Sequence, residues 1–421
     1  MTFERVKLGR VARTISGTGF PPTAQGNSAG EVPFLKVSDL ALEANRAGVE
    51  YANNWISSSA LKGLGGRVAP AGSIVFPKVG AALLGNARAQ LLRAAAMDNN
   101  LMAVVPTAGD SRFWLYALSS IDLAKFSPGG PLPYVTDSQV RDLQLPMPPL
   151  DEQRRIADFL DTETARLDQL ANLRIRQAST LVEAGLSQAF AGICGRDEPG
   201  ARRPTGVDWL GDVPASWPVM AVSHQFDVQL GKMLNPERAA GQNLAPYLRN
   251  TDVQWDRINT NDLLYMDFPP SERARYGLRE GDLMICEGGE PGRAAIWDGS
   301  VVPLYYQKAL HRARPRSFSL ARWLFYCLRA ATSMNVFAVE GNTTTIAHLT
   351  GEQLRAHRFP FPPPETQARI VGRLDASAEQ RGAVLVSMQR QIEVLSERRQ
   401  TLITAAVTGE LDVTTARGAS A

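Results

Sequence analysis

The chain carries one long sequence motif twice. Leu145-Pro-Met-Pro-Pro-Leu-Asp-Glu-Gln-Arg-Arg-Ile156 reappears as Phe359-Pro-Phe-Pro-Pro-Pro-Glu-Thr-Gln-Ala-Arg-Ile370. Each copy is followed by roughly 40 residues whose pattern is typical of one long helix. An internal repeat of this length predicts two tandem copies of one plan, a globular part followed by a helix. We therefore expect a protein that contacts another molecule twice, at a fixed separation, rather than one built around a single active site.

The bulk composition bounds the class of protein. Of the 421 residues, 44% are hydrophobic, which is enough for ordinary packed cores. The formal net charge is +3, so a basic face is compatible with the sequence but a histone-like polycation is excluded. The 3 cysteines are odd in number and scattered, which argues against a disulfide framework. This usage indicates a reducing compartment, the cytoplasm.

Membrane-targeting features are absent from the sequence. The first residues, Met1-Thr-Phe-Glu-Arg-Val-Lys7, lack the apolar core of a signal peptide. No run of about 18 apolar residues follows them. We expect a soluble protein that does not bind a membrane.

Two globular segments alternate with the two helical segments. Short β-branched stretches separated by Gly, Pro and Asn fill both globular segments, as in Ser73-Ile-Val-Phe76 and Asp282-Leu-Met-Ile-Cys286. This pattern predicts α+β domains dominated by short strands. The expected boundaries are 1–147 for the first domain, 148–192 for the first helix, 193–204 for a polar linker, 205–361 for the second domain, 362–412 for the second helix and 413–421 for a disordered tail.

Further paired elements keep the same order in both halves. Ser16-Gly-Thr-Gly-Phe-Pro21 corresponds to Leu230-Gly-Lys-Met-Leu-Asn-Pro236. Phe113-Trp-Leu-Tyr-Ala-Leu118 corresponds to Arg322-Trp-Leu-Phe-Tyr-Cys-Leu328. The common order predicts that the two domains share one fold.

The helical segments have the signals of a coiled coil. Asp151, Glu152 and Glu365 place negative charge in the first turns, where the free N–H groups favour it. In the second helix, apolar residues recur at 3-4 spacing, namely Leu385, Met388, Ile392, Leu395, Leu402 and Ala406. The first helix begins in the same way with Ile156, Leu160, Leu167 and Leu170, loses the spacing around Arg174 and resumes it with Ile175, Ala178 and Val182.

Two arrangements of these helices are compatible with the pattern. A helix of about 40 residues is about 60 Å long, which is more than one globular domain covers by itself. We therefore expect the two helices to pack together as a spacer. The alternative is that each helix belongs to the core of its own domain and binds nothing else.

Motifs of catalysis are missing. The chain has no Gly-Lys-Ser/Thr phosphate loop, since Gly231-Lys232 is followed by Met233. The histidines do not cluster with cysteines or carboxylates at metal-ligand spacing. Glu287-Gly-Gly-Glu-Pro-Gly-Arg293 is rich in glycine and suits either a phosphate cradle or a tight hairpin, of which the hairpin is favoured. We expect no catalytic residue and no metal site in this chain.

Side chains suited to nucleic-acid contact remain. Lys and Arg bind phosphates and set position, while Arg, Lys, Asn and Gln at base edges discriminate sequence. The candidate DNA-binding residues lie at expected strand ends and loops, and they are Lys36, Lys78, Arg88, Asn99, Asn100, Arg249, Asn250, Arg293, Gln307, Lys308, Asn342, Thr343 and Thr344.

These candidates correspond between the halves. Lys36 pairs with Arg249, Lys78 with Glu287, and Asn99-Asn100 falls close to Gln307-Lys308. Any single one of them is also compatible with a solvated surface charge or a turn residue. The Lys78/Glu287 difference fits two domains that share a scaffold and read different bases, because Glu accepts from cytosine where Lys donates to guanine.

Three motifs resemble the specificity (S) subunit of type I restriction–modification systems. They are the doubled helix start, seen here as Pro148-Pro-Leu-Asp-Glu-Gln-Arg-Arg-Ile156, the domain opening Thr205-Gly-Val-Asp-Trp-Leu-Gly-Asp-Val-Pro-Ala-Ser-Trp217, and the helix end Ala405-Ala-Val-Thr-Gly-Glu-Leu-Asp412. Together they cover nearly the whole chain. The second helix start departs from the pattern at Pro364 and Thr366.

The resemblance implies a fold and a function. The fold is α+β, with two tandem target-recognition domains, each followed by a long helix, and the two helices packed as an antiparallel coiled coil. The implied function is sequence-specific recognition of a bipartite, non-palindromic DNA target in a phage-defence system. The alternative is a protein-binding adaptor of repeated domains and a coiled coil, without recognition of DNA sequence.

The resemblance also implies partners. They are double-stranded DNA, two methyltransferase (M) subunits and motor-nuclease (R) subunits. S-adenosylmethionine, ATP and Mg belong to those partners, so no cofactor is expected in this chain.

Overall fold

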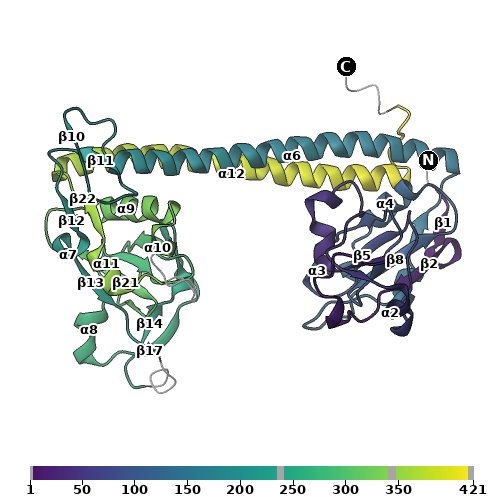
Figure 1. The fold of residues 1–421 in the computed structure, drawn as a ribbon, viewed down its shortest axis with the longest axis horizontal. Coiled ribbons are helices and arrows are strands. Elements are labelled where there is room, and N and C mark those ends of the chain that lie inside the picture. Colours follow the sequence, from purple (N-terminus) through teal and green to yellow (C-terminus); the bar gives the residue numbers. More distant parts are fainter. Residues whose placement is uncertain (1–2, 235–240, 340–347, 416–421) are drawn as a thin grey trace. The chain divides into compact units, whose positions relative to one another are not determined.

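The protein divides into two compact units in a computed structural model that describes residues 3–234, 241–339 and 348–415 (Figure 1). Unit 1 comprises Met1–Ile175 and Gln389–Ala421, and unit 2 comprises Arg176–Met388. Each unit contains one globular domain and one part of each of two long helices, α6 (Leu150–Ile193) and α12 (Pro364–Thr408). The two helices predicted from the doubled motif are therefore present.

The domain of unit 1 is built from short strands and short helices. A four-stranded antiparallel sheet has the order β2-β8-β5-β6, a smaller sheet has the order β4-β3-β7, and β1 pairs with β9. The strands are β1 (Arg5–Lys7), β2 (Ala12–Ser16), β3 (Val32–Leu35), β4 (Trp55–Ile56), β5 (Ile74–Pro77), β6 (Ala89–Gln90), β7 (Ala96–Met97), β8 (Leu101–Pro106) and β9 (Gln144–Pro146). The helices are α1 (Leu8–Val11), α2 (Ser58–Gly63), α3 (Ala81–Leu84), α4 (Ser111–Ser119) and α5 (Asp137–Arg141).

The domain of unit 2 repeats this plan. Its four-stranded sheet has the order β13-β21-β18-β19, its smaller sheet has the order β17-β14-β20, and β12 pairs with β22. The strands are β10 (Arg202–Pro204), β11 (Asp212–Pro214), β12 (Val219–Ala221), β13 (Phe226–Leu230), β14 (Leu244–Leu248), β15 (Val253–Gln254), β16 (Arg257–Ile258), β17 (Leu264–Asp267), β18 (Leu283–Cys286), β19 (Ala294–Ile296), β20 (Tyr305–Tyr306), β21 (Leu310–Pro315) and β22 (Arg358–Pro360). The helices are α7 (Val222–Gln225), α8 (Pro270–Tyr276), α9 (Ala321–Ser333), α10 (Val336–Val339) and α11 (Gly351–Ala356).

Chain order and pairing agree between the two domains. In both, the smaller sheet joins one antiparallel and one parallel pair, β3 with β4 and β7 in unit 1, and β14 with β17 and β20 in unit 2. The longest helix of each domain, α4 or α9, follows the last strand of the four-stranded sheet. The predicted fold class, a tandem pair of α+β domains each followed by a long helix, is confirmed.

The four-stranded sheet is buried on both faces, and the alternation of its side chains explains why. In β5, Ile74 and Phe76 pack into the cluster that contains α4 and the long helices, whereas Val75 points into a cluster shared with the smaller sheet. Successive side chains of a strand point to opposite faces. In β18, Ile285 and Met284 divide in the same way between two clusters. Each domain is therefore a layered core, with the sheet in the middle.

The long helices pack antiparallel in each unit. In unit 1, Ile156 and Leu160 near the start of α6 share a buried cluster with Ile403 near the end of α12. In unit 2, Ile193 at the end of α6 is buried with Ile370 near the start of α12. The start of one helix thus meets the end of the other. Figure 1 shows α6 and α12 side by side in both units, so the predicted antiparallel packing is confirmed.

The apolar pattern identifies the contact face of α12 correctly. Leu385, Met388, Ile392, Leu395 and Leu402 are all half-buried. Most residues between them face solvent, and Val386 is 72% exposed, whereas Arg399 is half-buried. On α6, Ile156, Leu160 and Leu167 are buried as predicted.

The pattern misplaces the middle of α6. Leu170 does not lie in the contact face, because its side chain is 44% exposed, and Ile175 and Val182 are exposed as well. The 3-4 spacing continues without a break through Ala171, Arg174, Ala178 and Leu181, which are half-buried. Of the predicted residues Ile175, Ala178 and Val182, Ala178 lies on the contact face, which it shares here with Ala171, Arg174 and Leu181.

The segments outside the domains also differ from expectation. Within the expected linker, Arg202–Pro204 form β10, which pairs with β11. At the expected tail, Val413 is buried in the cluster of unit 1, and residues 416–421 lie outside the described part. Among the described residues, no helix is long and apolar enough to cross a membrane.

Candidate nucleic-acid interface

In unit 1 three strand ends meet. Lys36 follows β3, Lys78 follows β5, and Asn99 and Asn100 form the turn between β7 and β8. The Lys78 N–H donates to the Asn100 carbonyl at 2.8 Å, and the Asp98 N–H donates to the Leu35 carbonyl at 2.9 Å. These backbone bonds hold the predicted residues together. We call Lys36, Lys78, Asn99 and Asn100 the strand-end edge of unit 1.

Unit 2 forms the same edge with different side chains. Arg249 follows β14, Glu287 follows β18, and Gln307 and Lys308 begin the turn between β20 and β21. The Glu287 N–H donates to the Ala309 carbonyl at 2.9 Å, and the Gln307 N–H donates to the Leu248 carbonyl at 3.1 Å. Arg249, Glu287, Gln307 and Lys308 are the strand-end edge of unit 2. The correspondence predicted for Lys36 with Arg249 and for Lys78 with Glu287 is present in the backbone.

A glycine lets the preceding loop cross each edge. A Cβ on Gly17 would lie 1.7 Å from the Asp98 carbonyl oxygen, and one on Gly231 would lie 2.2 Å from the Gln307 carbonyl oxygen. Only glycine permits so close an approach of two backbones. The next residue of each loop, Thr18 or Lys232, donates its N–H across the contact, at 3.0 and 3.1 Å. The loops predicted as counterparts thus border the two edges.

Some side chains at the strand-end edge of unit 1 make contacts within the described part of the chain, and others make no hydrogen bond or ion pair there. The Lys36 ammonium lies 3.7 Å from the centre of the Phe20 ring and donates to Gln25. Burial raises the pKa of Asp98, against the hydrogen bonds from Asn100 and the charge of Lys36. The side chains of Lys78 and Asn99 make no hydrogen bond or ion pair with a described residue. Both are therefore available to a ligand.

At the strand-end edge of unit 2, Arg249 is paired, whereas the other side chains make no hydrogen bond or ion pair with a described residue. Asp252 accepts two bonds from the Arg249 guanidinium, at 3.0 and 2.8 Å, and this pairing raises the pKa of Arg249. Glu287, Gln307 and Lys308 make no side-chain hydrogen bond or ion pair within the described residues. Lys308 is exposed, and the other two are half-exposed.

Asn250 and Arg293 lie beside this edge but are tied to backbone. The Asn250 amide donates to the Gly288 carbonyl at 2.9 Å, and Arg293 donates to the Asn250 carbonyl at 3.1 Å. Arg293 is in the loop between β18 and β19, which is a hairpin, as the sequence favours, because its strands pair antiparallel. Asn342, Thr343 and Thr344 lie outside the described residues.

Arg88 faces a different part of unit 1. Its guanidinium donates to the Asn86 side chain at 2.6 Å and lies 5.0 Å from the centre of the Phe76 ring. Burial lowers the pKa of Arg88 to about 10, against the charge of Asp122. It lines a cavity of about 710 Å³ together with α4, α6 and α12. The structure does not bring Arg88 to the strand-end edge, and its role in DNA binding stays a prediction.

Two aspartates that support the edges were not among the residues predicted from the sequence. Asp39 and Asp252 each accept the N–H of the residue three positions earlier, Lys36 or Arg249, at 2.7 Å. The signal was present, because Lys36-Val-Ser-Asp39 and Arg249-Asn-Thr-Asp252 share an aspartate that caps a short helix.

In the sequence, Lys232 is notable only because Gly231-Lys232-Met233 does not match a phosphate loop, and no role is predicted for it. Its side chain is 2% exposed, and its ammonium lies 2.5 Å from a carboxylate oxygen of Glu272. It also donates to the Asp267 carbonyl. Lys232 therefore anchors α8 beneath the edge of unit 2, and no local sequence signal names Glu272 as its partner.

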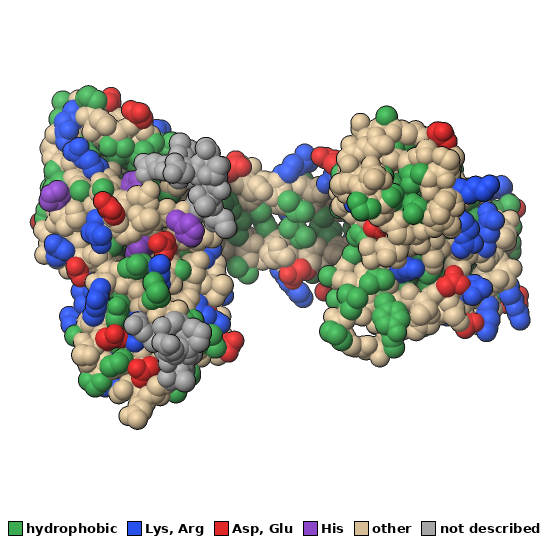
Figure 2. All heavy atoms as spheres, turned by 60° about the horizontal axis from the view of Figure 1, so that its bottom comes forward, with side chains coloured by type: hydrophobic (Ala, Val, Ile, Leu, Met, Phe, Trp, Pro, Cys, Tyr) green, Lys and Arg blue, Asp and Glu red, His purple; other side chains and the backbone are tan. Residues whose placement is uncertain are grey.

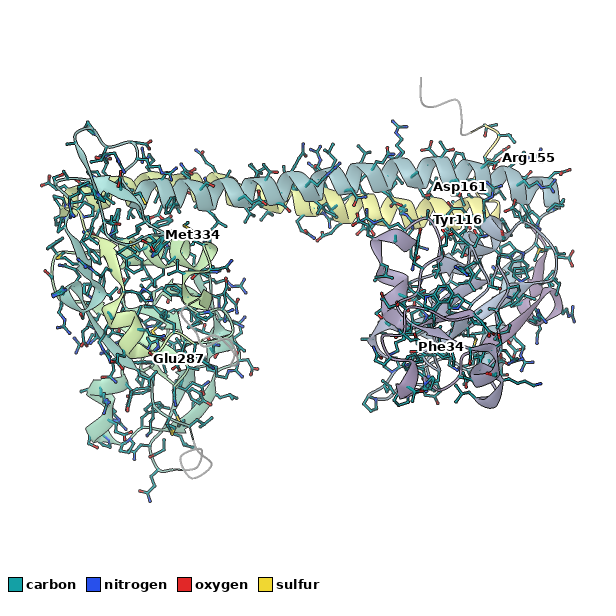
Figure 3. The ribbon with its side chains drawn as sticks, in the orientation of Figure 1. Phe34, Tyr116, Arg155, Asp161, Glu287 and Met334 are labelled. Atoms are coloured by element: carbon teal, nitrogen blue, oxygen red, sulfur yellow. The ribbon has the colours of Figure 1, made fainter. Side chains whose placement is uncertain are left out.

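The same three side chains fasten each domain to a long helix. In unit 1, Tyr116 donates to Asp161 at 2.7 Å, and Arg112 donates to it at 2.9 Å (Figure 3). In unit 2, Tyr326 and Arg322 of α9 donate to Asp375 of α12 at 2.5 and 2.8 Å. We call each set a domain latch. Each latch lies within one unit. It therefore fixes the orientation of that unit's domain, and of its strand-end edge, on the long helix.

Charge on the faces of the units is mixed. Figure 2 shows Lys and Arg side chains gathered on one flank of unit 1, and on unit 2 basic, acidic and histidine side chains interspersed. Elements β1, α1, β2 and α5 carry exposed basic residues, namely Arg5, Lys7, Arg10, Arg13 and Arg141. Such a surface suits phosphate contacts at a few positions rather than a continuous polycationic track.

Metal-ligating and thiol groups bear on catalysis at these edges, within the described ranges 3–234, 241–339 and 348–415. Among the described residues, no group of three or more His, Cys, Asp or Glu side chains could hold a metal ion. The cysteines are buried and unpaired, and burial raises the pKa of Cys194 and of Cys286 to about 11. Near neutral pH both thiols stay protonated, so neither is an activated nucleophile.

Known proteins share this organisation. The family model described as type I restriction modification DNA specificity domain matches residues 1–178 and 225–381. The chain is 21% identical over 287 residues to the specificity subunit of the type I restriction enzyme EcoKI from Escherichia coli strain K12. That match covers 64% of this chain, and the chain spans 58% of the length of this relative.

The chain is also similar to solved structures. One, described as the structural basis of complex assembly and conformational transition of the type I R-M system, has a TM-score of 0.67 and 19% identity, and the match covers 97% of this chain and 98% of that chain. The crystal structure of the HsdS subunit from Thermoanaerobacter tengcongensis is 18% identical over 97% of both chains, with a TM-score of 0.44. Because the family model matches most of the chain in two tandem segments, the chain belongs to the family of type I restriction–modification specificity subunits.

Proposed function

We propose that this chain is the DNA-reading subunit of a type I restriction–modification complex and that it recognises a bipartite, non-palindromic target. The observation that carries the proposal is the duplicated strand-end edge. One backbone arrangement presents Lys36, Lys78 and Asn99 in unit 1 and Arg249, Glu287 and Gln307 in unit 2. Two equal scaffolds with unequal side chains suit two different half-sites.

The chain itself supplies no reaction in this proposal. Adenine methylation and restriction belong to partners, two methyltransferase subunits and the motor-nuclease subunits, in the cytoplasm. S-adenosylmethionine, ATP and Mg are bound by those partners, and a membrane plays no part.

Exposed apolar side chains on the long helices support docking of the methyltransferase subunits there. Large apolar groups that face water on a helix mark an interaction surface when they gather. The exposed ones on α6 and α12 are Leu150, Leu170, Leu173, Ile175, Val182, Val384, Val386 and Val394.

The first test is binding to duplex DNA. The chain, together with its methyltransferase partner, should bind a duplex containing the target with an affinity that falls steeply as salt rises, because phosphate contacts release counterions. Replacing Lys78 and Lys308 by alanine should weaken binding and flatten the salt dependence. Salt-insensitive binding to proteins alone, with no DNA binding, would favour the adaptor.

The second test is the target itself. Methylome sequencing of cells that carry this chain and its modification partner should show adenine methylation in two unlike half-sites with a constant gap. Exchange of residues 1–147 for another such domain should alter one half-site only. Loss of both half-sites would contradict modular reading.

A further inference from the structure

Glu287 and Lys78 occupy one position in two copies of the fold. Each directly follows the strand that lies in the middle of its four-stranded sheet, β18 or β5. Each donates its N–H to the turn of the strand-end edge, and each accepts at its carbonyl, from Leu349 at 2.7 Å or from Val135 at 2.9 Å. The backbone therefore presents both side chains from the same place, with opposite charge.

Within the described part of the chain, the Glu287 carboxylate makes no hydrogen bond or ion pair. Its charge acts on the buried His311, whose ring bonds the Leu349 carbonyl instead. The arginines at this edge are taken by other carboxylates, Arg249 by Asp252 and Arg293 by Glu290. Gly288 and Gly289, which follow Glu287, have no side chains of their own, and the His348 ring lies against Gly288. Figure 3 labels Glu287 in unit 2.

A free carboxylate at such an edge restricts what it can face. A phosphate repels it, and so do the two acceptors that guanine presents in the major groove. An exocyclic amino group, N4 of cytosine or N6 of adenine, donates to it. Lysine at the same position has the opposite preference, because it donates to the O6 and N7 acceptors of guanine or to a phosphate.

We propose that Glu287 is a base-reading residue of unit 2, which accepts a hydrogen bond from the exocyclic amino group of one base, and that Lys78 reads the corresponding position for unit 1. This inference rests on the proposed function. One good contact of this kind discriminates by about 10- to 100-fold between a base with the amino group and one without it. The amino group belongs to cytosine or to adenine, and the experiment separates the two.

The test uses the full chain in complex with its methyltransferase partner and a pool of duplexes randomised across the half-sites. The wild-type complex should select cytosine or adenine at one position of one half-site. Glu287→Gln should relax that position by about 10-fold or more and leave the other half-site unchanged. Glu287→Lys should shift the same position toward guanine. Lys78→Gln should relax one position of the opposite half-site.

Matched controls separate reading from folding. Glu280→Gln, an exposed glutamate of the same unit, should change no position. Glu287→Asp keeps the charge but shortens its reach, and it should weaken discrimination without changing the preferred base. An unchanged half-site in Glu287→Gln and Glu287→Lys would overturn the inference while leaving the proposed function intact. A wild-type complex that selects no sequence at all would overturn the proposed function, and the inference with it.

Discussion

Lys232 occupies the loop position of Thr18 in the other unit, but its side chain turns inward. Its ammonium is held by Glu272 and by the Asp267 carbonyl, and it lies 5.0 Å from the centre of the Phe268 ring. A buried charge of this kind is stable only while its partner is present.

Replacing Lys232 by methionine should therefore destabilise unit 2. Glu272, which is 33% exposed, would lose its cation and the Asp267 carbonyl would lose a donor, at a cost of about 1–3 kcal/mol. The measurement is the free energy of unfolding in urea. Lys62→Met, at an exposed lysine, is the control and should change stability by less than about 0.5 kcal/mol. A similar small effect at Lys232 would show that the pair contributes little.

Asp98 gives a prediction on pH. Burial raises its pKa in the folded state above the unfolded value, so the native protein binds this proton more tightly than the unfolded chain does. The charged side chain opposes folding above the folded pKa, and this penalty disappears as pH falls below the unfolded pKa. Asp98→Asn should thus be more stable than wild type at neutral pH. The difference should shrink as pH falls through the acidic range, measured by urea unfolding at several pH values. A difference that grows in acid would mean that the bonds from Asn100 outweigh burial.

At the scale of elements, two leucines of α6 that fit the same sequence pattern differ in burial. One lies in the contact face with α12 and the other does not. Leu167 is 6% exposed and Leu170 is 44% exposed. Leu167→Ala should cost about 2–5 kcal/mol, because it leaves a cavity at a buried position of α6. Leu170→Ala should cost less than about 0.5 kcal/mol. Urea unfolding of the free chain measures the free energy of unfolding of both variants. Equal losses of stability would place Leu170 in the contact face.

The domain latches predict an effect on geometry rather than on base preference. Tyr116→Phe with Asp161→Asn removes the bond from Tyr116 to Asp161 and the ion pair of Arg112 with Asp161, which together contribute about 1–3 kcal/mol, while Arg112 keeps its bond to Asp158. The half-site read by unit 1 should keep its sequence, while the complex should accept targets with a gap one base pair longer or shorter. Binding to duplexes of graded gap length measures this. Tyr51→Phe, at an exposed tyrosine, is the control, and an altered half-site in the latch variant would assign these residues to reading instead.

For the whole molecule, the helices are expected to act as a ruler under the proposed function. Val182 and Leu385 line one cavity of about 240 Å³ in unit 2, so these two positions lie at the same level of the helix pair. Inserting seven residues after each adds about 10 Å of helix and keeps the 3-4 spacing. The required gap should lengthen by about 3 base pairs, at about 3.4 Å each, with both half-sites unchanged. Methylome sequencing measures the gap, and an unchanged gap would refute the ruler.

The repeat and its main elements were predictable from the sequence, because their signals are local. The doubled Pro-rich motif marks the starts of α6 and α12, and the 3-4 spacing from Leu385 to Leu402 marks the contact face of α12. The correspondence of Lys36 with Arg249 and of Lys78 with Glu287 was also predictable, since order along the chain is kept in both copies.

Only the tertiary structure decided which side chains are free to act. Arg249 is bound to Asp252, Glu287 has no partner in the part of the chain that the structure describes, Arg88 faces the long helices, and Leu170 lies outside the contact face of α6. These outcomes depend on contacts between strands and helices far apart in the sequence. Local periodicity predicts the repeated order of elements. The partner of a charged side chain depends on how elements far apart in the sequence pack together, and a short stretch of sequence does not contain that information.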